Sequence, residues 1–547
     1  MMRRKSPKQG ELSSREYLSR ERGTIIKKWH GKTPVCIVYP NSYYIGMSNL
    51  AVHILYARLN NDPHIVGERC FFDENEEPRS VESGKALRSF PIVFITFSFE
   101  LDYINIPKLL GRSGIPLLAS ERRDSDPIIV AGGICAMANP EPVSRFIDLF
   151  IVGDIEATVA IFMRRYMEMA GKKRRTVMDE LSGFDWVYNP GMLDVTYLPD
   201  GTVEAFKPQD FSVALACYKG KDLGTSAIIT DRTEFSNMFL LEGTRGCPSR
   251  CPFCLLGNTY PFSYDPLERM KPDIEDVGII GGGVSFHPHL IKIAKAMKEA
   301  GKHVHLPSLR VDEITTDLVA LIRDEVKTLT FGIEAGSERL RKFIGKPLTN
   351  DAIYEKLEAV LAMKPFNLKL YFMIGLYGEE RKDLEDILTM VKHIHHIMIK
   401  AGAPKGFAGS VTVHVSPFVP KAFTPFQWLP MEEVNVLKDT IAWLKKGLAP
   451  VGNTYFTHES VKYSIVQGVL ARGDRRLGDA ILRFSRGDSF SKVMRESPLN
   501  LNFYVHRERG KEELFPWDFV RGRQTKEALW RRLSLLKGSS RITAKSS

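Results

Sequence analysis

The sequence has few cysteines and no long hydrophobic run, and these two shortages narrow the class of protein. Seven cysteines in 547 residues are a low and odd number for a disulfide-stabilised secreted domain. No apolar core follows the basic start MMRRKSPKQG, as it would in a secretory signal. No uninterrupted apolar run reaches the ~18 residues that a membrane span needs. The sequence therefore predicts a cytoplasmic protein with no membrane span and with reduced thiols.

Acidic residues are scarce at the two ends of the chain, where most of the net charge of +11 lies. Residues 1–32 and 521–547 each carry a formal charge of +7, so the body between them is slightly acidic. Basic tails of this kind bind RNA or an acidic partner, or act as solvated ends that aid solubility. In the second tail only Trp530 offers an aromatic ring to stack on a base. The charge distribution argues against a nucleic-acid partner.

The chain is longer than one hydrophobic core supports, and its pattern changes along its length. Residues 33–175 alternate short β-branched or aromatic runs, such as VCIVYP and PIVFITFSF, with helical patterns. This rhythm predicts an α/β domain with a doubly wound, Rossmann-like parallel sheet. Ligands of such sheets bind where the strands end. The segments at those ends, YPNSYYIGMSN, FSFELDY, AGGICAMANPEP and VGDIEAT, are rich in small, polar and acidic residues.

A second alternation of six apolar runs and helical gaps occupies residues 233–430. Six units are fewer than the eight of a closed barrel, which predicts an open, partial (β/α)6 barrel. Residues 176–232 between the two alternations have the pattern of a small β-rich linker. Residues 431–547 are predicted to be mostly helical with a basic tail, and residues 1–32 form a basic N-terminal segment.

Three of the seven cysteines lie together directly after the first predicted strand of the barrel, in EGTRGCPSRCPFCLLGN. Cys247, Cys251 and Cys254 are too few for a structural zinc site, which takes four ligands, and His287 and His289 downstream lack a paired spacing. A disulfide would leave one thiol over. An iron–sulfur cube can be held by three thiolates, which leaves one iron open to a small molecule. The pattern favours a catalytic iron–sulfur site.

The segment CPSRCPFC, placed after a strand of a partial barrel, resembles the cysteine motif of the radical S-adenosylmethionine superfamily. In that family the three cysteines hold a 4Fe-4S cluster, and the open iron binds the amino and carboxylate groups of S-adenosylmethionine. One electron from the cluster then releases a 5′-deoxyadenosyl radical. The resemblance implies that Cys247, Cys251 and Cys254 are the metal ligands. It also implies a reductant such as ferredoxin or flavodoxin as a partner.

Other barrel segments resemble the parts of that family that contact S-adenosylmethionine. The second predicted strand is followed by a run of glycines, and the third strand ends in polar residues. GIEAGSERL lies at the end of the fourth strand and MIGLYGEE at the end of the fifth strand. Glu334 would suit ribose hydroxyls or the ammonium of the cofactor, and the alternative is a salt bridge to Arg339 or Arg341. The resemblance assigns cofactor binding to Phe253, Gly281, Gly282, Gly283, Ser308, Arg310, Glu334, Ser337 and Ile374.

A Rossmann-like domain before the barrel resembles the cobalamin-binding subgroup of the superfamily, and the C-terminal segments resemble one poorly characterised branch of it. The loop NSYYIGMSN stands where mutase-related members have Asp-x-His-x-x-Gly, so cobalt would carry no protein histidine. A degenerate domain that has lost cobalamin is the alternative. The resemblance assigns cobalamin contacts to Tyr44, Gly46, Met47, Ser98, Glu100, Gly132, Gly133, Gly153, Asp154 and Glu156.

These resemblances predict a cobalamin-dependent radical methyltransferase that acts on an unactivated carbon, with protein side chains among the candidate substrates. A non-cobalamin radical enzyme, doing rearrangement or tRNA modification, is the main alternative, and cobalamin retention distinguishes the two. A tRNA methylthiotransferase would need a second cysteine triad, and Cys36, Cys70 and Cys135 are too far apart to supply one. A metal-binding RNA adaptor is the alternative of another class, and it would not cleave S-adenosylmethionine.

Overall fold

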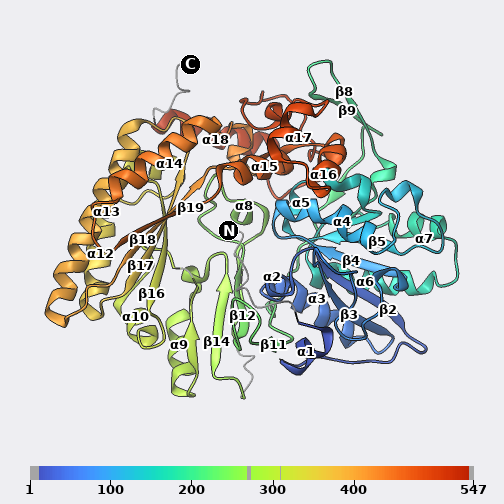
Figure 1. Cartoon of the computed structure of the whole chain (residues 1–547), viewed down its shortest axis with the longest axis horizontal. Coiled ribbons are helices and arrows are strands. Elements are labelled where there is room, and N and C mark those ends of the chain that lie inside the picture. The colour runs from blue at the N-terminus through green and yellow to red at the C-terminus, as the bar shows by residue number, and fades with distance from the viewer. Residues whose placement is uncertain (1–11, 268–272, 308, 541–547) are drawn as a thin grey trace.

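The computed structural model describes residues 12–267, 273–307 and 309–540 (Figure 1). Two α/β units lie side by side, the first in blue and teal and the second in green to orange. The C-terminal helices, in red, lie across the top of both units. In these ranges no helix is both long enough and apolar enough to cross a membrane.

The first unit is a six-stranded sheet whose strand order is β3–β2–β4–β5–β6–β7. Neighbouring strands are parallel from β3 to β6, which confirms the parallel sheet predicted for residues 33–175. The chain order reverses between β2 and β4, and such a switch point opens a crevice at the carboxyl edge. The strands are β2 (Thr33–Tyr39), β3 (Ile65–Phe71), β4 (Ile92–Thr96), β5 (Ile128–Gly132), β6 (Leu149–Ile151) and β7 (Val187–Tyr188).

Both faces of this sheet are buried, because its strands are apolar at consecutive positions. In β4, Ile92 and Phe94 belong to the core under α3 and α6, whereas Val93 and Ile95 belong to the core that α4 covers. Helices on both faces make the sheet doubly wound, as predicted. The helices of this unit are α2 (Tyr43–Met47), α3 (Leu50–Asn61), α4 (Asn105–Arg112), α5 (Ile134–Ala138), α6 (Ile155–Glu168) and α7 (Arg174–Leu181).

The segment predicted as a β-rich linker joins distant parts of the chain by short strand pairs. Its first strand, β7, is antiparallel to β6, so the first sheet continues beyond residue 175. One hairpin follows, and two further strands pair with the N-terminal and C-terminal segments. These strands are β8 (Asp194–Tyr197), β9 (Val203–Lys207), β10 (Val213–Ala214) with β20 (Val520–Arg521), and β11 (Ile229–Thr230) with β1 (Glu21–Arg22). Helix α1 (Ser14–Ser19) precedes β1.

The second unit contains all six strands predicted for the partial barrel and one more. Strands β12, β14 and β15 form one parallel set and β16 to β19 another, and a single bridge between Leu309 and Phe331 joins them. The strands are β12 (Phe239–Arg245), β14 (Asp276–Gly281), β15 (His303–His305), β16 (Thr328–Glu334), β17 (Asn367–Ile374), β18 (Val411–Pro417) and β19 (Thr454–His458), with β13 (Ser263–Tyr264) antiparallel to β12.

The region after residue 430 is mostly helical, as predicted, and it also contains a strand that was not predicted, β19. It pairs with β18 at the open edge of the sheet, and its Tyr455 is exposed. An edge strand with one neighbour buries little apolar surface, so its sequence TYFTH carries a weak strand signal. The remainder of the region is mainly helical: α14 (Val434–Leu448), α15 (Val461–Arg472), α16 (Gly478–Ser485), α17 (Phe490–Glu496) and α18 (Lys526–Ser540).

Each barrel strand buries one face under helices and leaves the other partly accessible. In β17, Leu368, Leu370 and Phe372 are buried, and Lys369 and Tyr371 between them are half-buried on the opposite face. This alternation gives the inner surface of the barrel its polar side chains. The helices outside the sheet are α9 (Leu290–Glu299), α10 (Thr316–Ile322), α11 (Glu338–Phe343), α12 (Asn350–Met363) and α13 (Arg381–Gly402), and α8 (Leu255–Thr259) follows the cysteines.

Candidate functional site

The cysteine loop begins where β12 ends and returns to the sheet through α8. Gly246 opens it with a φ of 70°, and a Cβ there would lie 2.6 Å from the carbonyl oxygen of Pro261. Glycine therefore fits this position best. Cys251 is buried, whereas Cys247 and Cys254 are half-buried. The amide of Cys254 donates to the carbonyl of Cys251 at 3.0 Å, so the last two cysteines share one tight turn.

Asn258 makes hydrogen bonds to this turn, and two residues of the C-terminal part of the chain make hydrogen bonds to Asn258. Its Nδ2 donates to the carbonyl oxygens of Cys251 at 2.9 Å and Cys254 at 2.8 Å. Its Oδ1 accepts from Gln524 at 3.1 Å and from Arg532 of α18 at 3.3 Å. Because Asn258 is buried, all four contacts replace lost water. Sequence reasoning missed this clamp, because Gln524 and Arg532 are 266 and 274 positions from Asn258.

The three thiols fit an iron–sulfur cubane by their chemistry and placement. Desolvation raises the pKa of Cys251 to about 11, and nearby Lys346 and Arg310 act against that shift. Burial also raises the pKa of Cys254. Among the described residues no three His, Cys, Asp or Glu side chains converge as they would on a single metal ion. A cubane does not require such convergence, because each thiolate binds a different iron.

The glycine run after β14 lies directly against the cysteine loop. A Cβ on Gly281 would stand 2.3 Å from the carbonyl oxygen of Thr244, and one on Gly282 would stand 1.9 Å from Leu256. The amide of Gly283 donates to the Thr244 hydroxyl at 3.3 Å. These glycines therefore let two strand ends meet. Gly281 and Gly282 remain exposed, so their backbone is accessible to a ligand.

Glu334 ends β16 in an unusual backbone conformation and is paired with a residue that sequence reasoning missed. Its φ is 73°, in the left-handed region that non-glycine residues seldom occupy. Its Oε1 accepts from Lys346 Nζ at 2.8 Å, and the same ammonium donates to the Gly332 carbonyl at 2.8 Å. The expected alternative partners are engaged elsewhere, Arg339 with Asp383 and Arg341 with backbone carbonyls.

The other residues assigned to S-adenosylmethionine differ in how accessible they are. Arg310 is half-buried near the thiols, held by Asp312 at 2.9 and 2.5 Å. Ser337 is buried as the N-cap of α11, where its Oγ accepts from the Leu340 amide. Ile374 is fully buried in the hydrophobic core of the barrel.

Phe253 and Ser308 complete that assignment. Phe253 is half-buried and packs on the main core beside the cysteines. The prediction for Ser308 falls outside the described residues.

A cavity of about 280 Å³ lies between the two units, where the strands of the first sheet end against the cysteine side of the barrel. The apolar residues of α3 and the ends of β4, β5 and β6 form one wall, and β12, α8 and β14 form the other. Six of the residues assigned to cobalamin line it: Ser98, Gly132, Gly133, Gly153, Asp154 and Glu156. From the barrel side the lining includes Glu242, Arg245, Leu256, Tyr260, Ile280 and Gly281.

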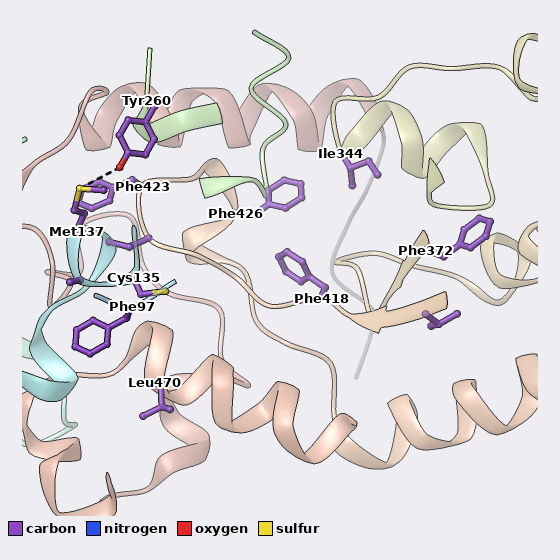
Figure 2. Packing of buried hydrophobic residues seen from close by; sticks show 14 of the residues in the cluster. Phe97, Cys135, Met137, Tyr260, Ile344, Phe372, Phe418, Phe423, Phe426 and Leu470 are labelled. Carbon is purple, nitrogen blue, oxygen red and sulfur yellow. Dashed lines mark hydrogen bonds between the residues drawn. The ribbon is translucent and has the colours of Figure 1, made fainter. Parts of the chain in front are cut away.

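Arg245 and Tyr260 of the barrel reach across this cavity to residues of the first unit. Arg245 of the barrel lies 2.9 Å from Glu156 and 3.3 Å from Asp154 of the first unit. Tyr260 donates its hydroxyl to the sulfur of Met137 at 3.5 Å, and Figure 2 shows this pair next to Phe97 and Cys135. Burial raises the pKa of Asp154 to about 6, and Arg245 opposes the rise.

The glycines at the strand ends of the first sheet differ in how much space surrounds them. A Cβ on Gly133 would lie 2.3 Å from the Phe97 carbonyl oxygen, and one on Gly153 would lie 2.6 Å from that of Ala216. Gly132 is different, because its Cβ would meet nothing closer than 3.7 Å. Gly132 is therefore the one of these three glycines at which a Cβ would meet only an ordinary van der Waals contact, and it lines the cavity.

The four remaining residues assigned to cobalamin do not line the cavity. Tyr44, Gly46 and Met47 belong to α2, where a Cβ on Gly46 would meet the Phe71 ring at 2.4 Å. Glu100 pairs with Lys421 and accepts from Gln467 at 2.9 Å, which ties the first unit to the C-terminal region.

The histidine of α3 makes two hydrogen bonds to the backbone. His53 of α3 places Nε2 2.9 Å from the Met47 carbonyl oxygen and Nδ1 within 3.4 Å of the Ile228 amide. The described lining of the cavity contains no histidine.

Two family models match the chain. Residues 241–391 match the radical SAM superfamily, and residues 51–190 match the model described as radical SAM proteins, N-terminal. The chain therefore carries a radical SAM domain in its second unit and the N-terminal domain of radical SAM proteins in its first. These two matches support the predicted superfamily at the level of the matched domains.

One curated relative and several solved structures resemble the chain. An uncharacterized protein of Methanocaldococcus jannaschii is 28% identical over 459 residues, covering 81% of this chain and 89% of the relative. The cobalamin-dependent S-adenosylmethionine radical enzyme OxsB with aqua-cobalamin and S-adenosylmethionine bound matches at 13% identity and a TM-score of 0.40. That match covers 66% of this chain and 52% of OxsB, about half its length. Coproporphyrinogen III oxidase of Escherichia coli matches at 13% identity and a TM-score of 0.25, covering 38% and 51%.

Proposed function

We propose that this radical SAM protein is a cobalamin-dependent methyltransferase that methylates an unactivated carbon, with protein side chains among its candidate substrates. The observation that carries the proposal is the cavity between the units. Its walls join the carboxyl edge of a switch-point sheet, where such sheets bind ligands, to the cysteine side of the barrel. A cofactor held there would face the cysteine loop.

The proposed cluster and S-adenosylmethionine share the barrel side. Cys247, Cys251 and Cys254 would bind three irons of a 4Fe-4S cluster, which supplies the electron that cleaves S-adenosylmethionine. The exposed backbone of Gly281 and Gly282 would meet the methionyl end of the cofactor. Glu334 and Lys346 would orient its polar groups, because both are mostly buried and already fixed by each other. A ferredoxin or flavodoxin would supply the electron.

The first unit would hold cobalamin, which supplies the methyl group. Apolar α3 and the cavity-lining Gly132 suit a flat, mainly apolar ring. A volume of about 280 Å³ is small for so large a cofactor. Binding therefore requires Arg245 and Tyr260 to withdraw from their contacts across the cavity. The second candidate is a radical enzyme without cobalamin. The contacts of Arg245 and Tyr260 favour it, because they join the two units directly across the cavity.

The test is hydroxocobalamin binding to anaerobically reconstituted protein. We expect near-stoichiometric binding to the unmodified chain and loss of binding in Gly132→Leu, whose side chain would fill the cavity. Gly452→Leu is the matched control, because nothing lies within 4 Å of its Cβ position. Iron content should be equal in all three proteins. Cleavage of S-adenosylmethionine without any cobalamin binding would establish the second candidate instead.

A further inference from the structure

A second cavity, of about 590 Å³, lies in the first unit and is lined by arginines. Two arginine-containing segments, ERRD at 121–124 and KKRR at 172–175, meet at its rim. Its charged lining consists of Arg122, Arg123, Arg145, Arg174, Arg175, Arg475, Asp124 and Asp148. No feature of the proposed methyl transfer uses this cavity.

This cavity is at the opposite edge of the sheet from the proposed cobalamin site. Residues 118–124 precede β5 and residues 144–148 precede β6, whereas the cavity between the units is lined by residues at the far ends of those strands. The five residues of β5 separate the two edges by roughly 16 Å at the usual rise of a strand. The two cavities are therefore distinct sites.

The buried charges of the cavity are unbalanced toward the positive. Arg122 and Arg174 approach the same oxygen of Asp148, each at 2.7 Å, and the Arg122 side chain is fully buried. One carboxylate neutralises one guanidinium, so this group of three carries an excess positive charge. Such a charge is expensive to bury without a counterion. The two carboxylates of the lining, Asp124 and Asp148, do not balance its six arginines, and an anion in the cavity would offset the excess.

The rim adds two arginines without acidic partners. Arg123 and Arg175 are exposed, and within the described ranges neither side chain pairs with a carboxylate. Arg175 lies in the first turn of α7, which has no acidic residue and no side-chain cap from its N-cap residue, Lys173. Positive side chains at a helix N-terminus oppose the helix dipole, and in the described ranges the counter-charge at this helix end is Asp124, which accepts from the first backbone amide of α7 at 3.0 Å.

Apolar side chains form part of the cavity wall. Leu118, Ile147 and Met178 line it, with Pro190 next to them. A ligand that fills the cavity would therefore carry negative charge at one end and an apolar or aromatic group at the other. Guanidinium groups bind phosphate oxygens through bidentate hydrogen bonds.

We propose that this cavity binds a small phosphate-bearing molecule, of the class of nucleoside diphosphates and triphosphates. The phosphates lie among Arg174, Arg123 and Arg175, and the organic part lies on the apolar wall. Arg122 contributes only its charge, because its nitrogens already donate to Asp148 and to backbone carbonyls. Arg475 at the cavity also pairs with Glu141 at 2.7 Å and donates to the Leu193 carbonyl, so the site reaches the contact with the C-terminal region.

The experiment is isothermal titration of the full chain with ADP, ATP and inorganic pyrophosphate at low ionic strength. We expect one molecule per chain, with the nucleotides tighter than pyrophosphate because of the apolar wall. The variant Arg123→Gln/Arg175→Gln should weaken nucleotide binding about tenfold or more, as expected for the loss of charge-assisted contacts. Both replaced side chains are exposed, so the fold should be retained.

The matched control is Arg15→Gln/Arg164→Gln, which removes the same charge from two exposed positions that do not line the cavity. Equal weakening in both double variants would mean nonspecific attraction and would overturn the proposal. Absence of nucleotide binding at millimolar concentration would also overturn it. Binding of an acidic or phosphorylated peptide in place of nucleotides would assign the face to a protein partner instead.

Discussion

At the scale of single residues, the three cysteines are the clearest functional feature of the chain. We expect reconstituted protein to hold about four irons at this site. Replacing Cys247, Cys251 and Cys254 together by alanine should abolish the cluster, measured as iron content and visible absorbance. Cys217→Ala is the control, because that thiol is half-buried and far from the motif in sequence. A triple variant that keeps its full iron content would show that other cysteines are the ligands.

Glu334 should act on S-adenosylmethionine without acting on the cluster. We expect Glu334→Ala to weaken binding of the cofactor about tenfold, the size of a lost hydrogen bond to a charged group, because Lys346 also loses its fixed partner. Iron content should not change. Glu313→Ala, at an exposed loop position, is the control. Unchanged affinity in Glu334→Ala would leave the carboxylate a purely structural partner of Lys346.

We expect Asp154 to make the free energy of unfolding depend on pH. Its pKa is raised to about 6 by burial, whereas an unfolded aspartate ionises near pH 4. Between these values the folded state holds the proton and the unfolded state does not, so the free energy of unfolding falls as pH rises. The loss is about 2–3 kcal/mol by linkage. Asp154→Asn should remove this fall, measured as thermal midpoints from pH 4 to 7. Parallel curves for the two proteins would contradict the raised pKa.

At the scale of elements, α18 supports the cysteine loop from the other end of the chain. Arg532 donates to the Arg250 carbonyl inside the loop and to Asn258, which holds two cysteine carbonyls. We expect Arg532→Gln to lose its cluster several-fold faster under chelator challenge, because the turn is less constrained. The neighbouring Arg531→Gln is the matched control, since Arg531 is exposed. Equal rates would show that Asn258 suffices alone.

At the scale of the whole molecule, buried charges join the two units. Glu100 of the first unit pairs with Lys421 of the barrel region, and both side chains are largely buried. Lys421→Met should lower the thermal midpoint markedly, because it leaves a buried carboxylate uncompensated at a cost of about 3–5 kcal/mol. Glu100→Gln/Lys421→Met should recover much of the loss. A single variant as stable as the unmodified chain would mean that water reaches Glu100.

The local pattern of the sequence determined much of the architecture. Runs of apolar residues predicted five strands of the first sheet, because central parallel strands are buried on both faces and so have continuous apolar sequences. Six barrel strands were predicted from apolar runs separated by gaps long enough for helices. The cysteine spacing pointed directly to the candidate loop, since all three cysteines lie within eight positions. Short edge strands such as β19 were missed, because burial on one side leaves little pattern in the sequence.

Tertiary structure decided which distant residues meet. The sequence could not show that Glu334 pairs with Lys346, that Glu100 is taken up by Lys421, or that α18 clamps the cysteine loop. It also could not show that two arginine-containing segments form one arginine-lined cavity. These contacts join positions 12 to more than 300 residues apart, and hydropathy records only whether each residue is buried. Which buried charge faces which is fixed by how the strands and helices pack in three dimensions.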